Sequence, residues 1–266
     1  MAQGLRFSAN LGFLWTDRPL VARIHAAKAA GFAAVECHWP FDTPASMVKR
    51  ALTEANLPML ALNTSPGDLA SGDFGICALK GREDEAKAAI TDAITYAAEV
   101  GARAVHVMAG KGGEIDVFIE ALEFACELSA PLGLDILIEP LNPYDVPDYL
   151  LSTTGQAKAL IDTLNRPNLK LMFDCYHVAR SEGAVLERFI SLQPLIGHIQ
   201  IAAVPDRGAP DHGDIAYSTL LPEFARLGWQ KPNRCRIPAR GRHRGQLGLD
   251  ARLQKLIPQI VEGVIS

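Results

Sequence analysis

The sequence lacks the features that mark membrane-spanning and nucleic-acid-binding proteins. No apolar run in its 266 residues approaches the ~20 residues that span a bilayer, and no basic segment leads into an apolar stretch at the N-terminus, as in a signal peptide. Basic residues are outnumbered by acidic ones, which gives a net charge of −4. Contacts to nucleic-acid phosphates require a basic surface instead. These absences favour a cytoplasmic protein with no nucleic-acid or membrane partner.

Cysteine is also scarce, and its pattern argues against a disulfide framework or a zinc site. The number is odd, no Cys-x-x-Cys spacing occurs, and the positions are Cys37, Cys77, Cys126, Cys175 and Cys235. We expect reduced and mostly buried thiols. No internal repeat or interdomain linker is evident, and hydrophobic residues make up 48% of the chain, enough for a sizeable core. We therefore expect residues 1–266 to form one domain.

Short apolar segments alternate with helical patterns along the chain. We expect strands at residues 7–11, 33–37, 58–63, 103–108, 134–139, 169–174 and 197–201, and helices at residues 20–30, 44–55, 83–100, 114–132, 153–164, 182–191 and 217–227. The loops that follow strands are longer and more polar than those that precede them, notably 64–81, 140–152 and 203–216. One functional rim explains this asymmetry. The pattern predicts an α/β fold, a (β/α)8 TIM barrel, with a doubly wound open sheet as the alternative.

Three of the expected strands end on a polar residue that can bind a metal ion. Apolar runs lead to Glu139, Asp174 and Gln200. In a parallel barrel the C-terminal ends of the strands meet at one mouth, so these side chains should converge there. Two carboxylates and one amide oxygen are ligands that Mg²⁺ or Mn²⁺ favours. The sequence therefore predicts a divalent-metal site.

Each of the three residues also has an ordinary structural explanation. Glu139 could form a buried salt bridge, because a carboxylate at the end of a buried strand is costly unless it is paired or bound to a metal. Asp174 could serve as the N-cap of the next helix. Gln200 could bond to neighbouring backbone, and His198, two residues earlier on the same face, could replace or assist it as a ligand.

Other polar residues fall near the expected mouth. His177 stands one turn after Asp174 and is a candidate metal ligand or substrate contact, or an ordinary half-buried histidine. Arg207 is a candidate clamp for a substrate carboxylate, because guanidinium binds carboxylates in a bidentate manner; a solvated surface arginine is the alternative. Three further residues near strand ends could line the pocket, namely Glu36, His38 and His106.

With these residues in place, the chain resembles the hydroxypyruvate isomerase family of xylose-isomerase-like TIM barrels. The matching stretches run in order across residues 6–229 and are FSANLGFLWT, AAGFAAVE, GREDEAKAAITDAITYAAEVGA, HVMAG, ILIEPLN, RPNLKLMFDCYH and IGHIQIA. The resemblance implies that Glu139, Asp174 and Gln200 bind the metal. It implies that His177 and Arg207 face the substrate, and that Glu139 is one of two glutamates that exchange protons with it.

The activity implied by the resemblance is the interconversion of hydroxypyruvate and tartronate semialdehyde. The two acids differ by the position of one carbonyl, so an enediolate stabilised by the metal, with carboxylates moving the proton, connects them. The alternatives are an isomerase or epimerase of a four-carbon keto acid or free sugar, and a catalytically impaired derivative of the enzyme. A metal-dependent DNA-repair endonuclease is disfavoured by charge and ligand set. A homo-oligomer is an expectation from the fold alone.

The C-terminal segment departs from the family pattern from about residue 231. The family has an eighth strand ending Glu-Tyr-(Lys/Arg)-Pro, followed by Leu-Gly-Trp, and its glutamate is the fourth metal ligand and second acid/base. Here no acidic residue lies between Glu223 and Asp250, and arginines crowd the segment at Arg234, Arg236, Arg240, Arg242 and Arg244. We expect weakened metal binding and turnover, and an irregular eighth strand around Pro238.

A shift in the reading frame would account for this departure. Residues 234–254 can be encoded so that the same nucleotides, read from the second base of each codon, give DAEYRPAGDTEGSLGWMPAF. That string contains the missing Glu-Tyr-Arg-Pro and Leu-Gly-Trp, and an agreement this long is improbable by chance. We therefore predict a frameshift near residues 231–233, in the gene or in its sequencing.

Overall fold

Eight parallel strands form one sheet in the computed structural model, which describes residues 6–229 and the backbone of residues 233–235. The strands are β1 (Phe7–Asn10), β2 (Ala34–Glu36), β3 (Ala61–Asn63), β4 (Ala104–His106), β5 (Asp135–Ile138), β6 (Leu169–Asp174), β7 (Ile196–Ile201) and β8 (Asn233–Cys235). Their spatial order is β2-β1-β8-β7-β6-β5-β4-β3. Backbone bonds of Val35 to Pro58 (3.0 Å) and Leu60 (2.8 Å) join β2 to the segment before β3 and close the ring. The predicted TIM barrel is confirmed.

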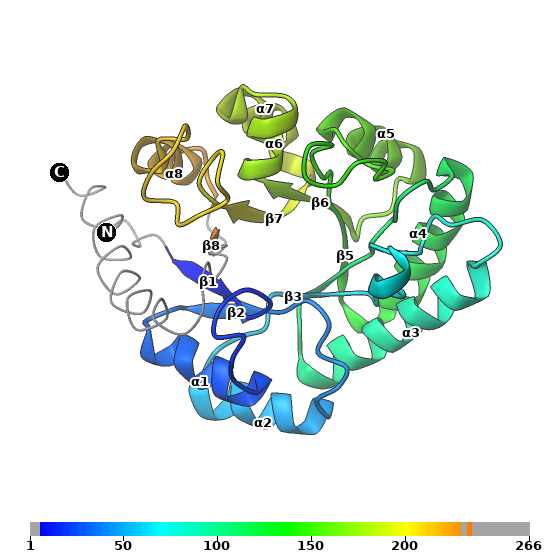
Figure 1. Ribbon diagram of the computed structural model, residues 1–266, viewed down its shortest axis with the longest axis horizontal. Coiled ribbons are helices and arrows are strands. Elements are labelled where there is room, and N and C mark those ends of the chain that lie inside the picture. Colours follow the sequence, from blue (N-terminus) through cyan, green and yellow to red (C-terminus); the bar gives the residue numbers. More distant parts are fainter. Residues whose placement is uncertain (1–5, 230–232, 236–266) are drawn as a thin grey trace.

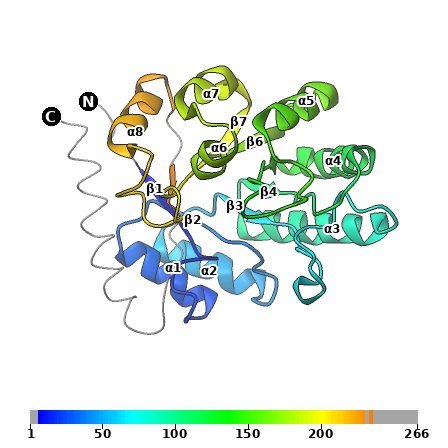
Figure 2. The same ribbon diagram turned by 45° about the horizontal axis from the view of Figure 1, so that its top comes forward.

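The helices lie around the outside of the strands (Figures 1 and 2). They are α1 (Leu20–Ala29), α2 (Ala45–Ala55), α3 (Glu83–Val100), α4 (Ile115–Ser129), α5 (Thr154–Leu164), α6 (Cys175–Ser181), α7 (Val185–Leu192) and α8 (Tyr217–Arg226), with 3₁₀ turns η1 (Leu69–Ser71), η2 (Ala130–Leu132) and η3 (Gln193–Leu195). Within the described part of the chain, none of them combines the length and apolarity needed to cross a membrane.

Local sequence signals explain where several helices begin and end. Thr153 and Gln156 form a capping box at the start of α5, and Gly101 ends α3 in the left-handed conformation with φ of 75°. The helix expected at residues 182–191 was placed wrongly at its start. A helix already runs from Cys175 to Ser181, and Gly183 and Ala184, with φ of 68° and 47°, separate it from α7.

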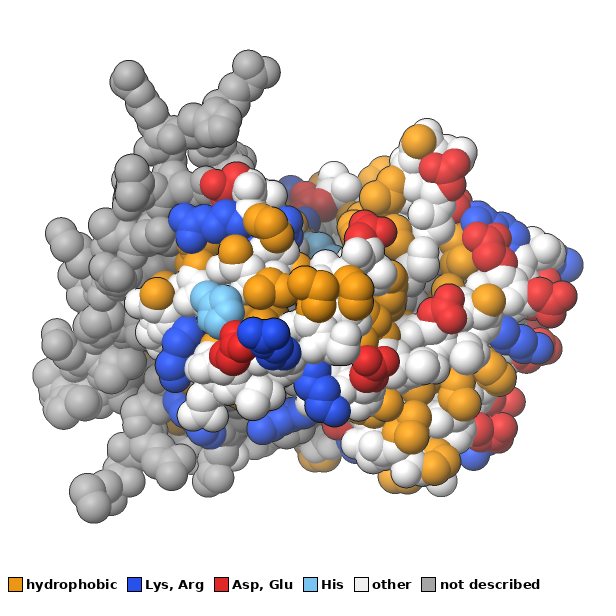
Figure 3. Space-filling model, turned by 90° about the horizontal axis from the view of Figure 1, so that it is seen from below, with side chains coloured by type: hydrophobic (Ala, Val, Ile, Leu, Met, Phe, Trp, Pro, Cys, Tyr) orange, Lys and Arg blue, Asp and Glu red, His pale blue; other side chains and the backbone are white. Residues whose placement is uncertain are grey.

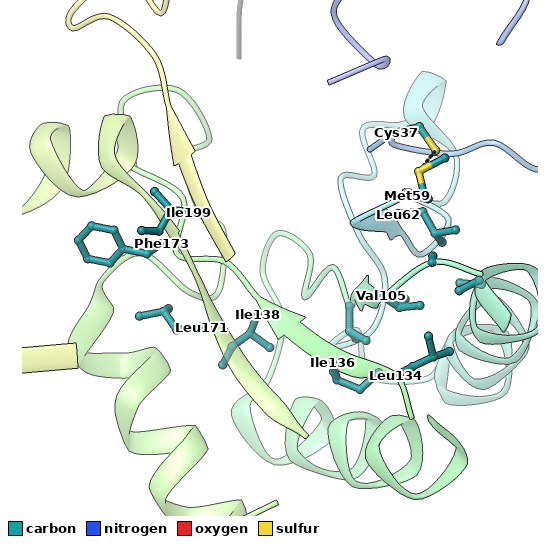
Figure 4. Packing of buried hydrophobic residues seen from close by; sticks show 14 of the residues in the cluster. Cys37, Met59, Leu62, Val105, Leu134, Ile136, Ile138, Leu171, Phe173 and Ile199 are labelled. Carbon is teal, nitrogen blue, oxygen red and sulfur yellow. Dashed lines mark hydrogen bonds between the residues drawn. The ribbon is translucent and has the colours of Figure 1, made fainter. Parts of the chain in front are cut away.

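The outward-facing strand residues pack against the helices and form the main core. Ile138, Leu171, Phe173 and Ile199 belong to this layer, and Figure 4 shows them on neighbouring strands. Alternate residues point to the other side of a strand. There a separate small cluster lies inside the barrel, formed by Ala61, Ala104, Leu137 and Met172. Glu139 and Asp174 follow two of these inward positions by two residues and therefore share the inward face.

Phe189 holds together the core between α7 and α8. Its fully buried ring stacks on Phe224 with 3.9 Å between centroids and meets Phe173 and Trp229 edge-on. Phe189→Ala should lower the free energy of unfolding by about 3–5 kcal/mol, because it leaves a cavity. Urea unfolding measures the loss, with Ile190→Ala, next to it and half-exposed, as the control at about 0.5 kcal/mol or less. Equal losses in the two variants would contradict this account of the core.

Four of the cysteines are buried and unbridged, as predicted: Cys37, Cys77, Cys126 and Cys175. Burial raises the pKa of the Cys77 thiol to about 12 and has the same effect on Cys126. A thiol with so high a pKa carries almost no thiolate at neutral pH, so these residues are packing groups rather than nucleophiles.

The eighth strand is present up to Cys235 and pairs on both sides. Position 234 is aligned with Ser8 of β1 and with Gln200 of β7. The strand is three residues long, like β2, β3 and β4. The rest of the divergent segment, residues 236–266, lies outside the described residues, and with it the predicted effect of Pro238 and most of the clustered arginines. The frameshift stays a prediction.

Candidate functional site

The three predicted metal ligands lie at the C-terminal ends of neighbouring strands. Glu139 follows β5 directly, Asp174 is the last residue of β6, and Gln200 lies near the end of β7. Asp174 and Gln200 are aligned with each other across the β6–β7 pair. Their exposed fractions are 6%, 1% and 0%. The barrel therefore brings three buried oxygen-bearing side chains to one mouth.

Glu139, Asp174 and His177 form a tight cluster. Each offers one ligand atom, and these atoms lie within 4.8 Å of one another. His177 Nε2 is 3.7 Å from Asp174 Oδ2 and 4.0 Å from Glu139 Oε1. Two buried carboxylates at this separation repel each other, and a cation between them would remove that cost. The cluster thus has the charge that a divalent cation requires.

Asp174 serves a structural role with one oxygen only. Its Oδ1 accepts a hydrogen bond of 2.9 Å from the backbone N–H of Tyr176, so it is the N-cap of α6, as the structural explanation proposed. Its Oδ2 lies on the side of His177. Capping therefore fixes the carboxylate and leaves its second oxygen turned toward the cluster.

Gln200 carries a buried oxygen to which no described residue donates a hydrogen bond. Within the described residues Oε1 has no hydrogen-bond partner, while Nε2 lies against the sulfur of Met172. An unsatisfied buried amide oxygen costs about 1–3 kcal/mol. The explanation by bonding to neighbouring backbone therefore does not describe this oxygen.

Both ring nitrogens of His177 lie against hydrogen-bond donors. The backbone N–H of Asn142 donates to Nδ1 at 3.0 Å, and the Asn142 side-chain nitrogen lies 2.8 Å from the same atom. A backbone amide can only donate, so Nδ1 is an acceptor. Nε2 lies 2.5 Å from Nη2 of Arg207, and a guanidinium can also only donate.

Arg207 bends into the mouth rather than into solvent. It has a left-handed backbone with φ of 58°, and its side chain is 22% exposed. Nη2 lies 2.5 Å from His177 Nε2, Nη1 lies 3.4 Å from Asp145 Oδ2, and the guanidinium carbon stands 4.8 Å above the ring of Tyr176. The solvated surface alternative for Arg207 is therefore wrong.

Of the remaining strand-end candidates, one joins the cluster, two pair with each other, and one packs against an aromatic ring. His106, which is buried, has Nδ1 at 3.8 Å from Glu139 Oε2 and so joins the cluster at the mouth. His198 bonds to Glu36, with 2.9 Å between Nε2 and Oε2, and both are buried. His38 packs edge-on against an aromatic ring of the segment between β1 and α1.

Sequence reasoning missed three residues that contact the predicted substrate-facing pair. Asn142 bonds to His177, Asp145 lies beside Arg207, and the hydroxyl of Tyr176 donates to Asp145 Oδ2 at 2.8 Å. Burial, followed by this hydrogen bond, raises the pKa of Tyr176 to about 12, so it stays a donor. Asn142 and Tyr176 stand inside the matching motif stretches, which was a usable signal. Asp145 had none.

Comparison with known proteins identifies the family. The family model described as the xylose isomerase-like TIM barrel matches residues 24–256. The chain belongs to this family. The 2-oxo-tetronate isomerase of Pectobacterium atrosepticum is 36% identical over 250 residues, which cover 91% of this chain and 95% of that protein. The hydroxypyruvate isomerase of Escherichia coli is 35% identical over 224 residues, covering 82% and 87%. The resemblance to hydroxypyruvate isomerases is thus confirmed, and the chain is an isomerase of this family.

Two solved structures share the fold of this chain. A protein from Brucella melitensis described as an AP endonuclease of family 2 superposes with a TM-score of 0.86 at 33% identity, covering 93% of this chain and 98% of that one. A D-allulose 3-epimerase from a Methylomonas species superposes with a TM-score of 0.76 at 18% identity, covering 98% and 100%. The second likeness concerns the fold alone.

Proposed function

We propose that the protein interconverts hydroxypyruvate and tartronate semialdehyde by proton transfer at a divalent-metal site. The observation that carries this proposal is the cluster of Glu139 and Asp174 beside the unsatisfied oxygen of Gln200, with Arg207 and His177 next to it. The oxygens suit a hard cation, and the guanidinium of Arg207 suits a carboxylate. A small acid with a neighbouring hydroxyl and carbonyl matches this site, because its two oxygens would bind the cation and its carboxylate would bind Arg207.

Glu139, Asp174 and Gln200 would hold Mg²⁺ or Mn²⁺. The fit is supported by the two close carboxylates, whose charge needs a cation, and by the Gln200 oxygen. When bound, the metal would polarise the substrate oxygens and stabilise negative charge that develops on them. His177 would stay outside this set, because its Nδ1 accepts from Asn142 and its Nε2 lies against Arg207.

The remaining groups of the mouth would bind the acid and move its proton. Arg207, with His177 beside it, would bind the carboxylate and fix the carbon chain beside Glu139. Glu139 would remove the proton from the carbon next to the carbonyl, which leaves an enediolate, and His106 would line the pocket behind it. Burial of Glu139, His106 and His177 strengthens their electrostatic interactions with the substrate.

Returning the proton to the neighbouring carbon requires a second acid. The chain with the sequence as it stands, called the written chain below, lacks this acid. Between Glu223 and Asp250 it has no acidic residue. With one surplus base removed, the predicted frame places a glutamate at position 236, two residues after the position aligned with Ser8 and Gln200. In a continued strand it shares their face of the sheet. The written chain would thus be an impaired form of the enzyme.

A four-carbon substrate is the second candidate. It is favoured by the relatives that carry the name 2-oxo-tetronate isomerase, one of them 36% identical to this chain. The two candidates share the metal site and the carboxylate clamp and differ by one hydroxymethyl group. Comparison of kcat/KM for hydroxypyruvate and for 2-oxo-tetronate, on the same preparation, separates them.

A nucleic-acid substrate, suggested by the description of the Brucella protein, agrees less well with this chain. The net charge is −4, and the face in Figure 3 has acidic and basic side chains interspersed. We propose instead a small-molecule partner and a cytoplasmic location, in one domain; assembly into a homo-oligomer stays a prediction. Incubation with a duplex that contains an abasic site should leave the strand uncut, and cleavage above a metal-only control would favour the endonuclease.

Removal of the divalent metal should abolish turnover and solvent-deuterium incorporation into hydroxypyruvate. EDTA followed by Mg²⁺ or Mn²⁺ tests this, since added metal should restore the activity. In the same preparation Gln200→Leu should weaken Mn²⁺ binding about 10- to 100-fold in calorimetry, because one oxygen ligand is lost. Gln200→Glu keeps an oxygen at this position and is the matched control. Full activity in EDTA, or equal Mn²⁺ affinity in both variants, would refute the metal site.

A further inference from the structure

Residues 142–145 of the β5–α5 loop form a turn whose side chains brace each other. The Asn142 Oδ1 accepts from the backbone N–H of Asp145 at 3.0 Å, and its Nδ2 donates to Asp145 Oδ2 at 3.2 Å. Asn142 is fully buried, whereas the side chain of Asp145 is 24% exposed. The turn therefore presents one carboxylate in a fixed orientation at the edge of the mouth.

We propose that Asp145 is a positioning residue, which turns the Arg207 guanidinium so that it accepts a substrate carboxylate and favours acids over neutral hydroxy-carbonyl compounds. The inference rests on the proposed function, because it concerns the same mouth. Asp145 itself would act through Arg207 and would not touch the substrate.

The contacts of Arg207 determine which edge of its guanidinium is occupied. Asp145 Oδ2 lies 3.4 Å from Nη1, on one side of the group. Nη2 lies on the side of His177, and Nε, which is buried, has no hydrogen-bond partner within the described residues. Nε and Nη2 together form one of the edges with which arginine binds a carboxylate in bidentate fashion. Asp145 thus engages Nη1 and leaves the Nε side of the guanidinium for a substrate carboxylate.

Tyr176 contacts both Arg207 and Asp145. Its ring lies 4.8 Å from the guanidinium carbon of Arg207, and its hydroxyl donates to Asp145 Oδ2 at 2.8 Å. The ring restricts the plane of the guanidinium, and the hydroxyl holds the carboxylate that restricts its rotation. Arg180, with Nη2 at 4.0 Å from Asp145 Oδ1, places a second cation on the outer side of the same carboxylate.

A simple charge effect predicts the opposite result, which makes the inference testable. If Asp145 acted only through its negative charge, Asp145→Asn would make the mouth more positive and bind an anion more tightly. If it positions Arg207, the same change releases the guanidinium from its orientation and weakens anion binding. The sign of the change in affinity therefore separates the two explanations.

The experiment is calorimetric binding to the full-length chain in saturating Mg²⁺. The probes are glycerate, a three-carbon hydroxy acid that does not isomerise, and glyceraldehyde, which is similar in size but uncharged. Asp145→Asn should weaken glycerate binding about 10- to 100-fold, as expected when a charge-assisted bidentate contact is lost, and change glyceraldehyde binding less than about twofold. Asp148→Asn, an exposed acid of the same loop, is the matched control and should change neither.

A second variant keeps the test informative if Asp145→Asn does not fold. Tyr176→Phe retains the ring and removes the hydroxyl, and it should weaken glycerate binding by about three- to tenfold. Unchanged or tighter glycerate binding in either folded variant would overturn the role of Asp145 while leaving the proposed function intact. Absence of glycerate binding in the unaltered chain would instead overturn the proposed function, and the inference with it.

Discussion

Restoring the predicted frame near residues 231–233 should raise isomerase activity by about a thousandfold or more. The written chain has one carboxylate proposed to transfer the proton, Glu139, and no acidic residue between Glu223 and Asp250. A general acid or base contributes about 10²–10⁴ in rate, and a paired acid and base act as a unit, so the loss of either member removes most of the effect. The restored glutamate would also add a fourth oxygen ligand and tighten metal binding.

Both chains should be expressed and assayed side by side with hydroxypyruvate in the presence of Mg²⁺ or Mn²⁺. The rate of isomerisation and the incorporation of solvent deuterium report the chemistry, and calorimetry with Mn²⁺ reports the ligand. A matched control replaces the restored glutamate at position 236 by glutamine, which should return activity to the level of the written chain. The frameshift hypothesis is wrong if no one-base change in the gene yields the sequence DAEYRPAGDTEGSLGWMPAF. It is also wrong if both chains turn over equally fast.

Glu139→Gln in the frame-restored chain should lower kcat by about 10³-fold or more. Glu139 is 6% exposed, lies within 4.8 Å of Asp174 and His177, and is proposed both to bind the metal and to remove the proton. Glutamine keeps the size and one oxygen, but it is neutral and cannot accept the proton. The rate should therefore stay low even when Mn²⁺ is raised to saturation.

Glu120→Gln, an exposed residue of α4, is the control for this substitution and should retain full activity. Mn²⁺ affinity, measured on the same samples, separates loss of the ligand charge from loss of the base. Retention of more than about a tenth of the rate by Glu139→Gln at saturating metal would assign proton transfer to another group.

The parts of the site that follow from strand periodicity could be predicted from the sequence. Apolar runs that end on Glu139, Asp174 and Gln200 specify both the strand and the residue at its C-terminal end, and a closed parallel sheet brings such ends together. Their shared inward face also follows, because side chains alternate along a strand. The fold was predictable for the same reason, since seven strand–helix units were legible.

The contacts made by loops could not be predicted in this way. Asp145 lies 62 residues from Arg207 and 31 from Tyr176, and their meeting depends on the shapes of loops that have no period. The left-handed backbone of Arg207, which directs its side chain into the mouth, has no sequence signal comparable to glycine. The expected ranges left out α6, although Asp174 was recognised as a possible N-cap, because the same residue ends a strand and caps a helix.

The most direct test of the account is a diffraction experiment at the manganese edge on crystals grown with Mn²⁺. We predict one anomalous peak at the mouth of the barrel, at about 2.0–2.3 Å from an oxygen of Glu139, of Asp174 and of Gln200, with His177 outside the coordination sphere. A peak coordinated by His177 and not by Gln200, or no peak at the mouth at millimolar Mn²⁺, would contradict the central claim.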